Sequence, residues 1–190
     1  GANVDCKAEN LCQFAVLGSV LATALDDIDA PKVGLLNVGS EAIKGNDQVK
    51  EANVLLEHSN LNYIGYVEGD DIYLGDVDVV VCDGFVGNVS LKTSEGVARF
   101  ISELAKKAFT KNILTKFVAL LAMRILKEFK NSIDPRRYNG ASLLGLRGNV
   151  IKSHGGADAL SFEYAISIAR LAAKKNVPDL IDKHLENFLT

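Results

Sequence analysis

Three short and strongly apolar runs limit the folds that this 190-residue chain can adopt. They cover residues 32–38, 62–67 and 77–82, and residues 47–59 between the first two have helical spacing of apolar side chains. Apolar runs of this length are typical of strands buried on both faces, and strand, helix, strand is the pattern of a parallel sheet. The sequence therefore predicts an α/β fold with a mostly parallel sheet.

Helical periodicity and turn residues predict the other elements. A first helix is expected from an N-cap at Asp5 to about Leu25, and another from about Val89 into residues 101–137. Turn residues dominate residues 131–148, a short strand is expected at 149–152, and helices at about 157–175 and 178–189 follow. We expect a single α/β domain portion, residues 1–190, in which residues 109–137 form a protruding apolar and basic helical segment.

Charge is segregated along the chain. Residues 1–100 contain six Lys or Arg against sixteen Asp or Glu, whereas residues 101–137 contain nine against three. The basic block coincides with the most apolar stretch, as an amphipathic segment on an anionic membrane requires. No window approaches the roughly 18 to 20 uninterrupted apolar residues of a membrane span. The alternative is an ordinary helix pair packed on the sheet or on a second subunit.

Composition also bears on partners and compartment. The basic block lacks interleaved stacking aromatics, so no nucleic-acid partner is expected. The three cysteines, Cys6, Cys12 and Cys82, have no CxxC spacing and lie in or beside apolar runs, so a disulfide framework is not expected. A reducing, cytoplasmic setting fits this pattern.

Three segments rich in Gly, Asn and cations follow predicted strands, at residues 39–46, 83–88 and 153–156. Ligands of open parallel sheets bind beyond the carboxyl ends of the strands, where loops and helix N-termini offer N–H groups. Glycines allow an anion to approach the backbone, and Lys44 and Lys92 could supply charge. Phosphate is the ligand that this pattern suggests. Three alternatives stay open here: the glycines form ordinary turns, Lys92 is a surface lysine, and His154 caps the helix that follows it.

Motifs for several other chemistries are absent from the sequence. GxGxxG, GxxxxGK[ST], GxSxG and HExxH do not occur, and His and Cys residues do not cluster. This argues against a P-loop ATPase, a serine hydrolase and a catalytic zinc. We expect no metal and no cofactor.

Six segments, taken in order, closely resemble the bacterial acyl-ACP:phosphate acyltransferases of phospholipid synthesis, the PlsX family. They are Gly1-Ala-Asn-Val-Asp, Val33-Gly-Leu-Leu-Asn-Val-Gly with Lys44-Gly45-Asn46, Val79-Val-Val-Cys-Asp-Gly-Phe-Val-Gly-Asn-Val, Leu91-Lys-Thr-Ser-Glu-Gly-Val-Ala, Asn139-Gly-Ala-Ser-Leu-Leu-Gly-Leu-Arg-Gly and Lys152-Ser-His-Gly. The resemblance covers essentially the whole chain and corresponds to the C-terminal portion of longer family members. Those members begin with a strand carrying an Asp-Ala-Met-Gly-Gly-Asp motif.

The resemblance implies a three-layer α/β/α fold related to phosphotransacetylase and isocitrate dehydrogenase-like folds. It also implies a homodimer attached peripherally to the inner face of the cell membrane. The implied reaction transfers a long-chain fatty acyl group from acyl carrier protein to inorganic phosphate, giving acyl phosphate for phospholipid synthesis. Such a site holds phosphate against the thioester, stabilises the oxyanion and protonates the departing thiolate.

This chemistry suggests a role for each candidate residue. We assign Lys44 to phosphate or oxyanion binding, the segment from Gly84 to Asn88 to a phosphate cradle, and His154 to orientation or proton delivery to the sulfur. Asp83 is expected to orient Lys44 or Lys92. The catalytic set is therefore Lys44, Asp83, Asn88 and His154. Phosphate and acyl binding are assigned to Gly84, Gly87, Lys92, Asn139 and Ser153, and membrane contact to Ile113, Phe117, Leu120 and Leu121.

Two other functions stay open at this point. One is a nicotinamide-dependent dehydrogenase of the isocitrate dehydrogenase-like fold, which needs clustered Asp metal ligands and a Tyr/Lys pair; the sequence shows no convincing cluster. The other is a non-catalytic fragment that binds a membrane or a partner. A basic surface of Lys106, Lys107, Arg136 and Arg137 would suit an acidic carrier protein, although membrane lipid competes for the same charges.

Overall fold

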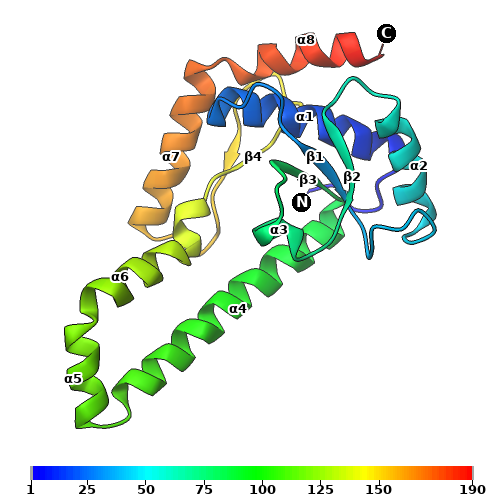
Figure 1. The fold of residues 1–190 in the computed structure, drawn as a ribbon. Coiled ribbons are helices and arrows are strands. Elements are labelled where there is room, and N and C mark those ends of the chain that lie inside the picture. The colour runs from blue at the N-terminus through cyan, green and yellow to red at the C-terminus, as the bar shows by residue number, and fades with distance from the viewer. Residues whose placement is uncertain (1, 190) are drawn as a thin grey trace.

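The structure, a computed structural model, describes residues 2–189 and has the expected α/β class (Figure 1). Its main sheet contains β1 (Val33–Leu36), β2 (Tyr63–Val67) and β3 (Val79–Val81) in the order β2-β1-β3. Both neighbours pair with β1 in parallel, and Val33 lies opposite Tyr63 on one side and Val79 on the other. The parallel sheet predicted from the three apolar runs is confirmed, and the fold is consistent with a three-layer α/β/α arrangement.

Helices account for most of the other elements. They are α1 (Ala8–Asp26), α2 (Asp47–Glu57), α3 (Asp71–Leu74), α4 (Gly84–Thr110), α5 (Ile113–Leu121), α6 (Met123–Ser132), the 3-10 helix η1 (Pro135–Tyr138), α7 (Ala159–Lys174) and α8 (Val177–Leu189). Two further strands, β4 (Ala141–Ser142) and β5 (Ile151–Lys152), form a separate antiparallel pair.

Helix α1 lies at the centre of the hydrophobic core. One cluster joins Leu11, Cys12 and Ala15 of α1 to Val33 and Leu35 of β1 and to Leu56 of α2. A second cluster joins Val16, Leu17 and Val20 of α1 to Ala172 of α7 and Ile181 of α8. Because α1 is covered on two sides, its sequence is apolar over most of its length.

Among the described residues, α1 is the one helix long and apolar enough to cross a membrane by length and composition, although its apolar residues are interrupted by polar side chains such as Glu9 and Gln13. Its buried side chains pack on the sheet and on α8, as those of a core helix do.

Two helix boundaries differ from those expected. Helix α1 begins at Ala8 rather than after an Asp5 cap, because Asp5 has a positive φ of 56° and the Lys7 N–H donates to Asn10 Oδ1 at 3.0 Å. Helix α4 begins at Gly84 rather than Val89, because the Asp83 carboxylate accepts the Val86 N–H at 2.7 Å.

The last strand also differs from expectation. The segment expected at residues 149–152 pairs with β4 and not with the parallel sheet.

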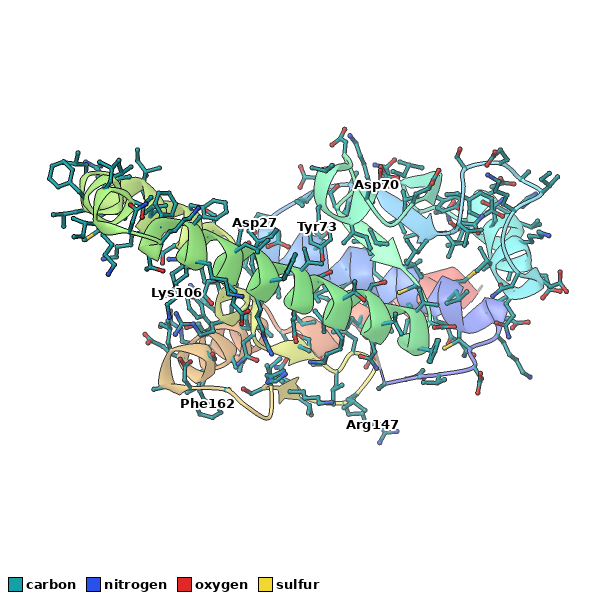
Figure 2. The ribbon with its side chains drawn as sticks, turned by 90° about the horizontal axis from the view of Figure 1, so that it is seen from below. Asp27, Asp70, Tyr73, Lys106, Arg147 and Phe162 are labelled. Atoms are coloured by element: carbon teal, nitrogen blue, oxygen red, sulfur yellow. The ribbon has the colours of Figure 1, made fainter. Side chains whose placement is uncertain are left out.

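Helices α4, α5 and α6 form an arm that extends away from the sheet (Figure 1). Seen from below, α4 lies across the front, and its far end, with α5 and α6, extends beyond the rest of the chain (Figure 2). Gly84 is the one buried residue of α4, and α5 and α6 have none; the structure describes every residue of these three helices. This arm carries most of residues 109–137.

Candidate functional site

The segment from Asp83 to Asn88 follows β3, as the sequence indicates, but it forms the first turn of α4 rather than a loop. Asp83 caps this turn, so its carboxylate accepts from Val86 rather than from a lysine. The expected orientation of Lys44 or Lys92 by Asp83 is therefore wrong, since these lysines pair with Glu41 and Glu95.

The backbone N–H groups of this turn are largely used within the protein. The N–H of Gly84 donates to Asn3 O at 2.6 Å, that of Val86 to the Asp83 side chain, and that of Gly87 to Asp83 O at 3.0 Å. A phosphate cradle in this turn would therefore have to use groups other than the N–H groups of Gly84, Val86 and Gly87. Gly87 also lies close to the residue that follows β3, because a Cβ added there would come within 3.2 Å of Cys82 Sγ.

Lys92, Glu95 and His154 form a polar cluster where α4 meets the loop after β5. Lys92 Nζ lies 2.9 Å from Glu95 Oε2 and 3.2 Å from His154 Nε2. Asn88, Lys92 and Glu95 are spaced four and three residues apart, which places them on one face of α4. The Lys92 hydrogen bond lowers the pKa of Glu95, with further contributions from the charges of Lys92, His154 and Arg99, so Glu95 is a carboxylate at neutral pH.

The His154 ring is fixed by its own loop. Its Nδ1 accepts the Gly156 N–H at 3.0 Å, and its backbone N–H donates to Asn139 Oδ1 at 2.8 Å. His154 does not cap α7, because Asp158 fills that position and accepts the Ser161 N–H at 2.9 Å. The alternative of a helix-capping histidine is therefore wrong.

Asn139 joins three segments that are distant in the sequence. Its Nδ2 donates to Ser153 Oγ and to Ser161 O, both at 2.8 Å, and its Oδ1 accepts from the His154 backbone. Both amide hydrogens are therefore used inside the protein. The side chain ties the end of η1 to the β5 loop and to α7.

An ion-pair network holds η1 against the start of α7. Arg136 lies 2.6 Å from Asp134 and 2.9 Å from Asp158. Hydrogen bonds from the backbone and hydroxyl of Ser161, then from Arg136, lower the pKa of Asp158 to about 2. Both carboxylates of this network are thus ionised at neutral pH, and Arg136, expected on a docking surface, is engaged within the fold.

Lys44 lies in a second cluster, in the loop after β1. Its ammonium pairs with Glu41 at 2.9 Å, and its side chain folds over Gly39, where an added Cβ would come within 2.5 Å of Lys44 Cδ. The Asn37 amide donates to Lys44 O at 3.2 Å and fixes the loop. Gly45 has a φ of 91° and lies against Asn37 Oδ1, so this position requires glycine.

The structure thus brings together some of the predicted site residues and not others. Lys92, Asn139, Ser153 and His154 form one connected set, whereas Lys44 forms its ion pair with Glu41 inside its own loop. Asp83, Gly84, Gly87 and Asn88 lie in the first turn of α4, on the same helix as Lys92. Sequence reasoning missed Glu95, although its spacing of three residues from Lys92 on a predicted helix was a usable signal.

The predicted membrane residues lie on the arm and are exposed. Ile113 and Leu121 have relative exposures of 87% and 73%, and Phe117 and Leu120 are also exposed. Lys106, which is labelled in Figure 2, belongs to α4 of the same arm. The arm therefore presents apolar and cationic side chains together.

The chemistry of the polar cluster is that of an anion site rather than of a metal site. Among residues 2–189, no group of three or more His, Cys, Asp or Glu side chains could hold a metal ion. Lys92 and His154 instead place a cation beside an imidazole, which can bind an anion and move a proton.

Comparisons with known proteins agree over the whole chain. A family model described as "Fatty acid synthesis protein" matches residues 1–180. The chain is 60% identical to the phosphate acyltransferase of Nitrosococcus oceani over 190 residues, and 59% identical to that of Alkalilimnicola ehrlichii over 189 residues. It is 57% identical to that of Legionella pneumophila over 190 residues. These matches cover 100% of this chain but only 56%, 55% and 56% of the relatives, so the chain spans about half of their length.

Proposed function

The chain belongs to the fatty acid synthesis protein family, and on that premise we propose that it provides part of a phosphate acyltransferase of phospholipid synthesis. The proposed reaction transfers a long-chain acyl group from acyl carrier protein to inorganic phosphate. The relatives named phosphate acyltransferase support the reaction class. The carrier-bound donor and the acyl phosphate product rest on the motifs that resemble this family.

The observation that carries this proposal is the contact of Lys92 Nζ with His154 Nε2 at 3.2 Å, braced by Asn139. Phosphate is a ready nucleophile and a thioester is an activated acyl donor, so the reaction needs no covalent enzyme intermediate. A phosphate oxygen attacks the carbonyl carbon, the carbon–sulfur bond breaks, and the thiolate takes up a proton. The site must therefore supply positive charge, orientation and a proton, which a lysine and a histidine provide.

Each residue of the site has a proposed role. Lys92 neutralises the phosphate, and His154 orients it or delivers the proton to the departing sulfur. Asn139 and Ser153 hold the His154 loop in place through the 2.8 Å bonds of the Asn139 amide. Lys44 is proposed to bind phosphate or the oxyanion from the loop after β1.

The turn from Gly84 to Asn88 is proposed to approach the phosphate from the start of α4. Its role is less extensive than a loop cradle would be, because the N–H groups of Gly84, Val86 and Gly87 already have acceptors. Asn88, one turn before Lys92, is the member of this segment on the cluster's helix face.

We propose that the arm places the protein on the inner face of the cell membrane. Ile113, Phe117, Leu120 and Leu121 are exposed, and cations such as Lys116 lie beside them. An interface with anionic lipid accommodates both kinds of side chain, by apolar burial and by roughly 1 kcal/mol for each cation near the surface. A cytoplasmic homodimer is proposed as the assembly, and the exposed apolar residues of α4, such as Phe100, support a partner surface.

The other two functions receive no specific support. The dehydrogenase alternative needs a cluster of metal ligands, and the described residues contain no group of three. A non-catalytic fragment is tested directly by assaying this chain beside the natural full-length protein.

The experiment that tests the proposed function supplies acyl carrier protein thioester and inorganic phosphate and identifies the products by mass spectrometry. We expect acyl phosphate and free carrier from the full-length protein, and no absorbance change on adding NAD with a hydroxy acid. Hydride transfer without acyl phosphate would instead show the dehydrogenase. The absence of both activities would refute an enzymatic role for the site.

A further inference from the structure

The proton of the neutral His154 ring is located by a backbone bond. The Gly156 N–H can only donate, and it donates to Nδ1 at 3.0 Å, so Nδ1 carries a lone pair. The neutral ring therefore has its proton on Nε2. A ring protonated on both nitrogens would lose the Gly156 bond.

Lys92 faces this same nitrogen. Its Nζ lies 3.2 Å from His154 Nε2, and an ammonium has three donors and no acceptor. With the proton of the ring on Nε2, the two groups are donors that face each other with no acceptor between them. One oxygen of an anion that accepts from both would satisfy this arrangement.

Glu95 accounts for the position of Lys92 in the absence of such an anion. Its Oε2 lies 2.9 Å from Lys92 Nζ, and its side chain is 14% exposed whereas that of Lys92 is 59% exposed. Arg99 also approaches Oε2, at 3.8 Å. The Glu95 carboxylate is thus held in place. Without Glu95, the Lys92 side chain would extend into solvent, because the Nε2–H of His154 offers the ammonium no acceptor.

We propose that Glu95 is a positioning residue that holds the Lys92 ammonium beside His154 Nε2, so that both groups donate to one oxygen of inorganic phosphate. The inference rests on the proposed function and refines its phosphate site. Glu95 does not touch the phosphate, and its own negative charge opposes the anion. The role of Glu95 therefore decides what its neutralisation does to phosphate binding. If Glu95 positions Lys92, phosphate binding becomes weaker. If Glu95 contributes only its negative charge, phosphate binding becomes tighter.

The test is Glu95→Gln in the natural full-length protein, with inorganic phosphate as the probe. Binding is followed by the side-chain nitrogen resonances of His154, which also report the tautomer. We expect the dissociation constant for phosphate to rise roughly tenfold, as the loss of a hydrogen bond to a charged group implies. The KM for phosphate should rise with it. The matched control is Glu103→Gln, which removes the same charge from an exposed position of α4 and should leave phosphate binding unchanged.

A double variant separates positioning from a general loss of structure. In a Lys92→Met background, Glu95→Gln should not weaken phosphate binding further, because the positioning effect of Glu95 acts only through Lys92 and the loss of its negative charge favours the anion. A full additional tenfold loss in that background would contradict the proposal, as would phosphate binding by Glu95→Gln that is unchanged or tighter.

The wild-type protein distinguishes failure of this inference from failure of the proposed function. His154 resonances that do not respond to phosphate would overturn the shared-oxygen site, whatever the activity. A wild type that binds phosphate at His154 with Nε2 protonated, yet forms no acyl phosphate, would support the site and refute the proposed function.

Discussion

Replacing Asn139 by alanine should loosen the His154 loop and lower the stability of the fold. The side chain makes three hydrogen bonds of 2.8 Å, to Ser153, Ser161 and the His154 backbone. At about 1 kcal/mol net for each bond, the sum is ~3 kcal/mol. We reduce it to about 2 kcal/mol because the exposed His154 N–H can bond to water in the variant. For a chain of this size that corresponds to a fall in Tm of roughly 4–8 °C.

Denaturant unfolding of Asn139→Ala and wild type measures this difference. The control is Asn149→Ala in the connection between β4 and β5, since the Asn149 side chain is exposed and makes no hydrogen bond with the described residues. That control should change the free energy of unfolding by less than about 0.5 kcal/mol. Equal unfolding free energies for Asn139→Ala and Asn149→Ala would refute the reasoning that the amide braces the loop. Because His154 is then less well placed, kcat/KM should also fall for Asn139→Ala.

The other predictions concern turnover, membrane binding and acid stability. Lys44→Ala should cost ~2–4 kcal/mol of transition-state stabilisation with unfolding unchanged, and a wild-type kcat/KM would remove Lys44 from the mechanism. Changing Leu120 and Leu121 to Glu should abolish pelleting with anionic liposomes but keep the dimer mass and soluble acyl transfer; loss of the dimer with unchanged lipid binding would identify a subunit interface instead. Asp158 has its pKa lowered to about 2, chiefly by hydrogen bonds from Ser161, so its contribution is present above the unfolded pKa of about 3.9 and is lost as pH falls through about 2. Asp158→Asn should therefore have a lower free energy of unfolding than wild type at neutral pH and should lose less of it on acidification. An equal loss of unfolding free energy in the two proteins as the pH falls would contradict this.

The parallel sheet could be predicted from the sequence because its central strand is buried. Val33 and Leu35 of β1 are fully buried, and residues 33–36 are all apolar or glycine, a composition that indicates a buried strand. The start of α4 was not predicted correctly, because the two glycines at 84 and 87 are typical of a loop. The helix nevertheless begins at Gly84, because the Asp83 side chain accepts the Val86 N–H and caps it. This side-chain hydrogen bond could not be predicted from residue spacing alone.

The candidate site was predictable in part for a similar reason. His154 and Lys92 follow strands in glycine-rich segments, which is a local signal, but they are 62 residues apart and their contact depends on tertiary packing. The antiparallel pairing of β5 with β4 involves two residues on each side, too few to give a pattern in the sequence. Asn139 was expected to contact substrate, whereas its amide hydrogens are used by Ser153 and Ser161, which only the folded geometry determines.

The central claim is acyl transfer to phosphate at the cluster of Lys92 and His154. The most direct measurement supplies acyl carrier protein thioester and phosphate labelled with heavy oxygen, and follows the acyl phosphate by mass spectrometry for wild type and His154→Ala. Because a phosphate oxygen attacks the carbonyl, wild type should form acyl phosphate that keeps all of the labelled oxygens, and His154→Ala should form it at least about a hundredfold more slowly. Release of free fatty acid without labelled acyl phosphate, or a wild-type rate for His154→Ala, would contradict the account.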